Sequence, residues 1–182
     1  MPINSFLYPA KNVSTAYEVE TDSTNRKDEK WYINTNESYA FGSGKVTRSW
    51  GTATAKKHAD TLYTQEDVDD DVDDNGDRKG DFSVGDVAVE GLKTVLIRTL
   101  KSQAAGELQR TDWYVIRKAD AGTAIPSAIE THRAAVRTKC ASMEASITNA
   151  ADTAALEILY TYTTDSEGVQ SRPLGEFPEL GS

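Results

Sequence analysis

Residues 108–137, LQRTDWYVIRKADAGTAIPSAIETHRAAVR, contain the turn around which the second half of this chain is organised. Thr111 or Asp112 can cap a short helix that runs to Lys118, because their side-chain oxygens accept hydrogen bonds from the free N–H groups of a first helical turn. Pro126 then begins a longer helix. Proline fits the first turn because the N–H that it lacks would have no partner within the helix. The stretch therefore predicts two antiparallel helices joined by an elbow.

Apolar residues recur at helical spacing on both sides of this elbow. Upstream, residues 86–109 are predicted to form one long helix. Its apolar positions are Leu92, Val95, Leu96, Leu100 and Ala104. Downstream, the helix from Pro126 carries a mostly apolar stripe of Ile129, His132, Val136, Cys140, Met143 and Ile147. Asp152 can cap a third helix that runs through Leu159. These patterns predict a helical hairpin or bundle over residues 82–160.

The first 51 residues favour strands and turns instead. Tyr39–Phe41 and Lys45–Thr47 flank a Gly-Ser-Gly turn, which is the signal of a β-hairpin. Residues 52–63 are rich in alanine and are predicted to form a short helix, and an acidic loop follows up to residue 81. Residues 161–182 contain two prolines and several glycines, so we expect an extended C-terminal arm. The predicted fold class is α+β, with a small N-terminal antiparallel β-sheet followed by a C-terminal helical hairpin or bundle.

The composition limits the classes of function. The 182 residues include 29 Asp and Glu against 20 Lys and Arg, a formal net charge of −9, which argues against nucleic acid as a partner because phosphate contacts need a positive surface. No apolar stretch approaches the roughly 20 residues that span a membrane. The single cysteine, Cys140, allows no intrachain disulfide, and residues 1–12 lack the basic region and apolar run of a secretory signal. We expect a soluble protein made in a cytosol.

The acidic loop holds the best candidate for a metal site. Asp71, Asp73, Asn75 and Asp77 place oxygen ligands at alternate positions around Gly76, as in the first half of a calcium loop. The second half departs from that pattern, because Phe82 stands at the twelfth position in place of the bidentate glutamate. The alternative is a solvated run of mutually repelling acids. No other cofactor is indicated.

No catalytic constellation is evident. His132 and Cys140 lie eight residues apart on one predicted helix, so a rise of about 12 Å separates them. A nucleophile and its base must come within hydrogen-bond reach, and both residues fit core packing better. We therefore expect that the chain is not an enzyme.

Several residues are candidates for protein–protein contacts. Trp113 offers a large apolar body with one N–H donor, although a structural elbow between two antiparallel helices is the favoured explanation for this residue. Three arginines could pair with carboxylates, stack on aromatic rings or face a neighbouring subunit; they are Arg117, Arg133 and Arg137. The chain ends carry apolar anchors beside prolines, as expected of extended arms that dock on a partner. These anchors are Phe6, Leu7, Tyr8, Leu174, Phe177 and Leu180. Disordered tails are the alternative.

The segment quoted first resembles one that recurs in tail and tail-fibre assembly proteins of tailed bacteriophages and in related phage structural proteins. Four residues match its L-x-x-T-D-W turn: Leu108, Thr111, Asp112 and Trp113. Arg133 and Arg137 match the arginines of its Y-R-x-x-(L/I)-R-like stretch, with His132 in place of the tyrosine and Val136 in place of leucine or isoleucine.

The resemblance implies a structural interaction protein of a phage virion, in the tail, baseplate or fibre region, that is assembled in the cytoplasm of the host bacterium. Its partners would be other virion proteins, with a homo-oligomer as a further possibility. One alternative is a tail or tail-fibre assembly chaperone that is absent from the mature particle. A second alternative is an accessory protein of the capsid or neck.

Overall fold

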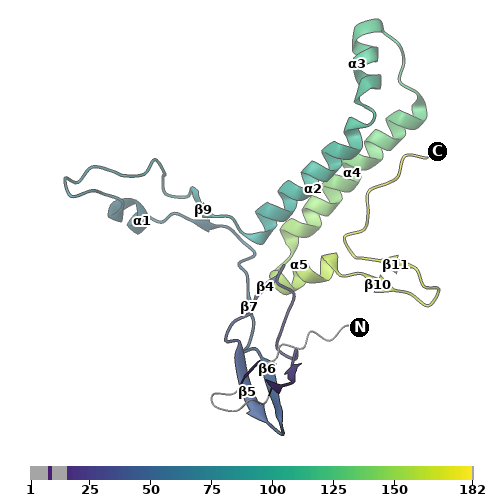
Figure 1. The fold of residues 1–182 in the computed structure, drawn as a ribbon. Helices are drawn as coiled ribbons and strands as arrows, with labels where there is room; N and C mark the ends of the chain where they lie inside the picture. Colours follow the sequence, from purple (N-terminus) through teal and green to yellow (C-terminus); the bar gives the residue numbers. More distant parts are fainter. Residues whose placement is uncertain (1–7, 10–15, 182) are drawn as a thin grey trace. The chain divides into compact units, whose positions relative to one another are not determined.

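The computed structural model describes Tyr8, Pro9 and residues 16–181 (Figure 1). The chain divides into two compact units, residues 1–56 and residues 57–182. A small N-terminal sheet of three strands is followed by C-terminal helices, with 39% of the chain helical and 18% in strands. The predicted α+β fold class is therefore confirmed.

The N-terminal unit is built on a three-stranded sheet in the order β3 (Val19–Thr21), β6 (Lys45–Ser49) and β5 (Ser38–Gly42). β5 and β6 are antiparallel, as the hairpin signal predicts. Ser43 and Gly44 turn the chain between them with φ of 52° and 78°, and positive φ at both central residues is the requirement of a type I′ hairpin turn.

The sheet is nevertheless not antiparallel throughout. β3 pairs with β6 in the parallel sense, so the prediction of a purely antiparallel sheet was wrong for this pair. Only β5 and β6 are joined by a tight turn that imposes opposite directions. β3 reaches β6 after a long intervening segment, which leaves its direction free.

Among the described residues of this unit, the buried ones lie outside the three-stranded sheet. Trp31, Tyr32 and Trp50 are buried, whereas every residue of β5 is exposed. The guanidinium groups of Arg26 and Arg48 lie over the Trp50 ring at 5.2 and 4.7 Å. Two further pairs of two-residue strands complete the described part of the unit: β1 (Tyr8–Pro9) with β2 (Ala16–Tyr17), and β4 (Tyr32–Ile33) with β7 (Thr54–Ala55).

The alanine-rich helix predicted over residues 52–63 is absent, and that prediction was wrong. The segment forms β7 and β8 (Thr61–Leu62) instead, and β8 pairs with β9 (Val87–Val89). Helix propensity is a weak preference that pairing with a distant strand overrides. The same pairing displaces the start of the long helix from residue 86 to Leu92. Within the acidic segment, Thr64 caps a short helix, α1 (Gln65–Asp70).

The first long helix, α2 (Leu92–Gln109), begins against the segment before β8. Its N-cap is Gly91, where an added Cβ would lie 2.3 Å from the carbonyl carbon of Ala59, so no larger residue fits. The Asp60 carboxylate accepts hydrogen bonds from the Gly91 N–H at 2.6 Å and from the Thr94 hydroxyl at 2.8 Å. A side chain 31 positions upstream therefore caps a helix that has no side-chain cap of its own.

The second long helix, α4 (Ser127–Asn149), packs along α2 (Figure 1). The predicted apolar stripes meet in this contact, and the prediction of a helical hairpin is confirmed. The buried members are Leu96, Leu100 and Ala104 of α2 and Ile129, His132, Val136, Met143 and Ile147 of α4. Cys140 is half-buried. The helix α3 (Asp112–Ala121) lies between α2 and α4 in sequence and ends at Gly122, whose φ is 68°.

The C-terminal segment is partly tied to the helices. Asp152 caps α5 (Thr153–Tyr160) by accepting from the Ala155 N–H, as predicted. A hairpin of β10 (Thr163–Thr164) and β11 (Gln170–Ser171) follows. Leu174 is only 3% exposed and donates its N–H to the Leu159 carbonyl. The prediction that Leu174 anchors a partner was therefore wrong, because this chain itself buries the side chain. Within the described residues, no helix has both the length and the apolar character that crossing a membrane requires.

The cap by Asp60 predicts a pH-dependent stability. Hydrogen bonds from the Gly91 N–H and the Thr94 hydroxyl hold the pKa of Asp60 below its ordinary value. A carboxyl group with a depressed pKa stabilises the fold above its unfolded pKa of about 3.9, and that contribution is lost as the pH falls through the folded pKa. We expect D60N to lower the melting temperature at neutral pH, and the difference from the wild type to shrink in acid. A difference that stays constant from pH 7 to pH 3 would contradict the cap.

The burial of Leu174 predicts a matched pair of stability effects. L174A removes a buried side chain, and we expect it to lower the free energy of unfolding by about 2–4 kcal/mol. L180A makes the same chemical change at a half-buried position, so its effect should be clearly smaller. Urea unfolding measured by circular dichroism compares the two. Equal losses would show that Leu174 is no more embedded than Leu180.

Candidate functional site

The elbow between α2 and α3 is held by a buried arginine. Nη1 of Arg133, on α4, lies 2.8 Å from the Leu108 carbonyl oxygen, 2.7 Å from Thr111 Oγ1 and 2.9 Å from Asp112 Oδ1. The Thr111 hydroxyl donates in turn to the Leu108 carbonyl at 3.0 Å. These four residues are called the elbow cluster below. They are all members of the phage-like segment, and the fold brings them together.

The cluster accounts for the end of one helix and the start of the next. The last carbonyls of a helix have no partner inside it, and Arg133 binds that of Leu108. Thr111 stands at the N-cap of α3, as predicted, but its side chain makes no capping bond and serves Arg133 instead. Thr111 is 1% exposed and Arg133 7% exposed, so the cationic charge is buried, while its counter-charge on Asp112 stays half exposed.

Arg133 adopts one of the alternatives that the sequence left open for the arginines, because it pairs with a carboxylate. The helical pattern places it off the apolar stripe, where it could have faced a neighbouring subunit. Its guanidinium instead points into the elbow, where it contacts Leu108, Thr111 and Asp112 of the same chain. Arg137, one turn further along α4, is exposed and forms no ion pair among the described residues. The two arginines of the phage-like pattern therefore differ in their surroundings.

The outer side of α3 carries an aromatic and cationic stack. The guanidinium of Arg117 lies 4.5 Å from the Trp113 ring centroid and 5.4 Å from that of Tyr114, and the two rings are 4.2 Å apart. Nε of Arg117 is buried without a hydrogen-bond partner in the described part of the chain. Trp113 itself remains 51% exposed. Stacking thus fixes the cation but leaves its charge unneutralised.

α3 is short of packing partners. None of its residues is buried, although Ile116 is 67% exposed and Val115 40% exposed beside Trp113. Isolated helices of this length are marginal in water. Two ion pairs, from Arg133 to Asp112 and from Lys118 to Glu130 at 3.5 Å, link it to α4. The helix is held in place by polar links while its apolar side chains face outward, which suits an interaction surface.

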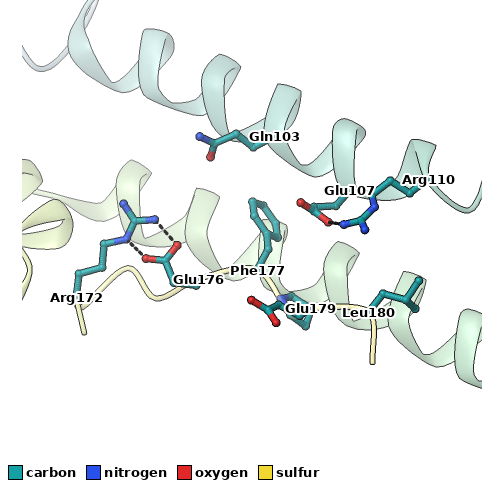
Figure 2. A pocket seen from close by; sticks show the side chains of 9 residues that line it. Gln103, Glu107, Arg110, Arg172, Glu176, Phe177, Glu179 and Leu180 are labelled. Carbon is teal, nitrogen blue, oxygen red and sulfur yellow. Dashed lines mark hydrogen bonds and ion pairs between the residues drawn. The ribbon is translucent and has the colours of Figure 1, made fainter. Parts of the chain in front are cut away.

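A second candidate surface lies where the C-terminal tail crosses α2. A groove of about 600 Å³ runs between them (Figure 2). Figure 2 shows the Phe177 ring directed from the tail toward α2, near Gln103 and Glu107. The groove is lined by Gln103, Glu107, Arg110, Arg172, Glu176, Phe177, Pro178, Glu179 and Leu180. Phe177 and Leu180, both predicted as anchors, are half-buried here.

Arg172 fixes the path of the tail beside this groove. It holds both carboxylate oxygens of Glu176, with Nε to Oε1 at 2.7 Å and Nη2 to Oε2 at 2.8 Å. Its guanidinium also lies over the rings of Tyr160 and Tyr162 at 5.5 and 5.2 Å. The hydrogen bond that Tyr162 donates to Glu176 raises the pKa of its hydroxyl, and burial raises that of Tyr160. The sequence interpretation missed Arg172 and Glu176, because a spacing of four residues indicates an ion pair only on a helix, and this segment is a turn.

The predicted calcium ligands are used by the acidic segment itself. The Asp73 carboxylate accepts from the N–H groups of Asn75 and Asp77 at 2.8 and 2.9 Å, and the Asp71 carboxylate accepts from Gly80. Across Tyr8, Pro9 and residues 16–181, no three His, Cys, Asp or Glu side chains form a group suited to a metal ion. The geometry of the described residues does not support the calcium prediction.

Two predicted anchors, Phe6 and Leu7, lie outside the described residues, and for Tyr8 only the backbone pairing in β1 is described. Comparison with protein-family models, with curated proteins and with solved structures found no match to this chain. The functional proposal therefore rests on the geometry of the candidate site and on the resemblance of residues 108–137.

The elbow cluster predicts unequal effects of two arginine substitutions on α4. R133M removes the donor to three oxygens of a buried site, and we expect a loss of about 1–3 kcal/mol in the free energy of unfolding. R137M changes an exposed arginine on the same helix and should stay within about 0.5 kcal/mol of the wild type. Urea titration with tryptophan fluorescence measures both. An R133M variant as stable as R137M would mean that the cluster does not hold the elbow.

Proposed function

We propose that this chain is a structural interaction protein of a tailed phage virion, in the tail, baseplate or fibre region, that acts through protein–protein contacts and not through catalysis. The observation that carries the proposal is the elbow cluster. Leu108, Thr111, Asp112 and Arg133 are four of the six residues by which the chain resembles phage tail and tail-fibre assembly proteins, and in this fold they form one hydrogen-bonded unit.

The surface around the cluster supports a binding role. Trp113 and Ile116 are 51% and 67% exposed on a helix that buries none of its residues. Aromatic side chains and arginines are enriched among the residues that dominate protein–protein binding, and both occur in the Trp113–Arg117 stack. An enzyme would instead require convergent acid, base or metal-binding groups, and the described residues around the elbow offer none.

The main alternative is a tail or tail-fibre assembly chaperone that leaves before the particle matures. An exposed aromatic surface suits such a protein equally well, because a chaperone also covers a partner's binding face. A capsid or neck accessory protein is the second alternative. The three proposals differ in where the protein resides after assembly, which is directly measurable.

The test is quantitative mass spectrometry of particles purified from an infected culture, compared with the unfractionated lysate. We expect the protein in the particles at a fixed ratio to the tail proteins. Particles separated into heads and tails provide the control, because a capsid or neck protein would follow the heads. Presence in the lysate together with absence from the particles would overturn a virion role in favour of a chaperone. Absence from every fraction that contains phage proteins would overturn the phage assignment itself.

A further inference from the structure

We propose that copies of this chain associate head to tail, with the acidic segment of one copy, residues 65–81, docking on the tip of another. The tip is the surface made by α3 together with the exposed cations of residues 110–139. This self-association does not rest on the proposed function. It concerns the purified chain alone, so its failure would leave the virion proposal standing.

The net charge of the chain conceals two regions of opposite sign. Residues 65–81 contain nine Asp and Glu against two Lys and Arg, a net of −7. Residues 110–139 contain six Lys and Arg against three Asp and Glu, a net of +3. Surfaces of opposite potential steer association and fix its register, so the tip is the region of the chain best suited to receive an acidic partner.

The cations of the tip are incompletely neutralised within one chain. Arg117 stacks on two rings and has no carboxylate partner among the described residues. Arg137 is exposed and likewise forms no ion pair in that part of the chain. The ion pairs of Arg110 and Lys118 are long, at 3.6 and 3.5 Å, and solvent-exposed pairs of this kind contribute little. An acidic partner would supply the missing counter-charges.

The acidic segment is a structured element that can present its charge. Its two ends are joined by the stacked rings of Tyr63 and Phe82, whose centroids lie 3.8 Å apart. Val72 forms an isolated bridge with Arg78 inside it. None of its nine carboxylates, all of them within the described residues, forms an ion pair.

The two surfaces also match in apolar character. The tip exposes Trp113 and Ile116, while the acidic segment and the strand after it expose Val72, Val84 and Val87 at 36%, 53% and 48%. Charge gives direction to an encounter, but burial of apolar surface provides most of the affinity. A partner that is both acidic and partly apolar therefore suits the tip better than a purely anionic ligand.

The two regions belong to opposite ends of α2. The acidic segment leads through β9 into Leu92 at the start of the helix, and the tip begins after Gln109 at its end. An 18-residue helix is about 27 Å long. Hydrogen bonds from Leu92 and Lys93 to the carbonyls of Lys57 and His58 fix the root of the acidic segment at the start of α2. This separation keeps the acidic segment and the tip of one chain apart, but the acidic segment of one copy can still bind the tip of another. A contact between unlike surfaces is heterologous, so it propagates into a ring or a filament.

The test exchanges the charges of the two surfaces. The first variant, D70K/D74K/D77K/D81K, replaces four exposed carboxylates that accept no hydrogen bond from the described residues, and it changes the net charge of residues 65–81 from −7 to +1. The second, R117E/R137E, makes the tip acidic. A third, R110E/R137E, leaves the Trp113–Arg117 stack intact and serves if the second does not fold. Sedimentation velocity over a concentration series measures the association of each, with circular dichroism as the check on folding.

We expect the wild type to associate at about 0.1 M salt and to dissociate at about 1 M, where the Debye length falls from about 10 Å to about 3 Å. Each reversed variant alone should bind itself at least about tenfold more weakly. An equimolar mixture of a segment variant and a tip variant should associate again, because every contact between the two different variants then joins opposite charges. A wild type that remains monomeric at low salt, or a mixture that does not recover association, would overturn the proposal.

Discussion

The position of α3 depends on one buried charge. A guanidinium removed from water needs acceptors for its donors and a counter-charge nearby. The Leu108 carbonyl, the Thr111 hydroxyl and the Asp112 carboxylate meet that need only when α2 ends and α3 begins beside the second turn of α4. The cluster therefore couples three helices through a single side chain. Any shift of the elbow would leave the Arg133 charge or the Leu108 carbonyl without a partner, so other arrangements of the elbow are unfavourable.

This polar link has a consequence for the surface. An apolar contact would have placed Trp113 and Ile116 against α4, whereas a hydrogen-bonded elbow orients α3 without using its apolar side chains. Stability and exposure are thereby separated: the α2–α4 interface supplies the packed core, and α3 keeps its aromatic and aliphatic groups for a partner. The C-terminal tail shows the opposite solution. Leu174 is buried against its own chain. Of the predicted C-terminal anchors, Phe177 and Leu180 stay half-buried beside the groove.

The sequence predicted those features that depend on local pattern. Helical spacing identified the buried positions of α2 and α4, and the Gly-Ser-Gly turn identified the β5–β6 hairpin, because both patterns arise between near neighbours. It failed where distant segments decide the structure. β7 pairs with β4, and β8 pairs with β9 across 25 residues, so strands replace the predicted alanine-rich helix. The second pairing also shortens α2. Periodicity describes where a Cβ points, so it missed Arg133, whose long side chain carries its charge from the edge of the stripe into the elbow. Leu174 was misassigned for the same reason, since only the fold shows that Leu159 lies next to it.

The net charge has a similar limit, because adding all charges of the chain discards where each charge lies. A net charge of −9 argues against a nucleic-acid partner for the chain as a whole, yet the field near a surface is set by charges within about a Debye length of it. Arg117 lies beyond that distance from the root of the acidic segment, because the whole length of α2 intervenes. An approaching partner therefore encounters two separate surfaces of opposite sign and not one averaged charge. What binds at the tip is determined by the residues near Trp113, whereas the net charge governs the solubility of the chain.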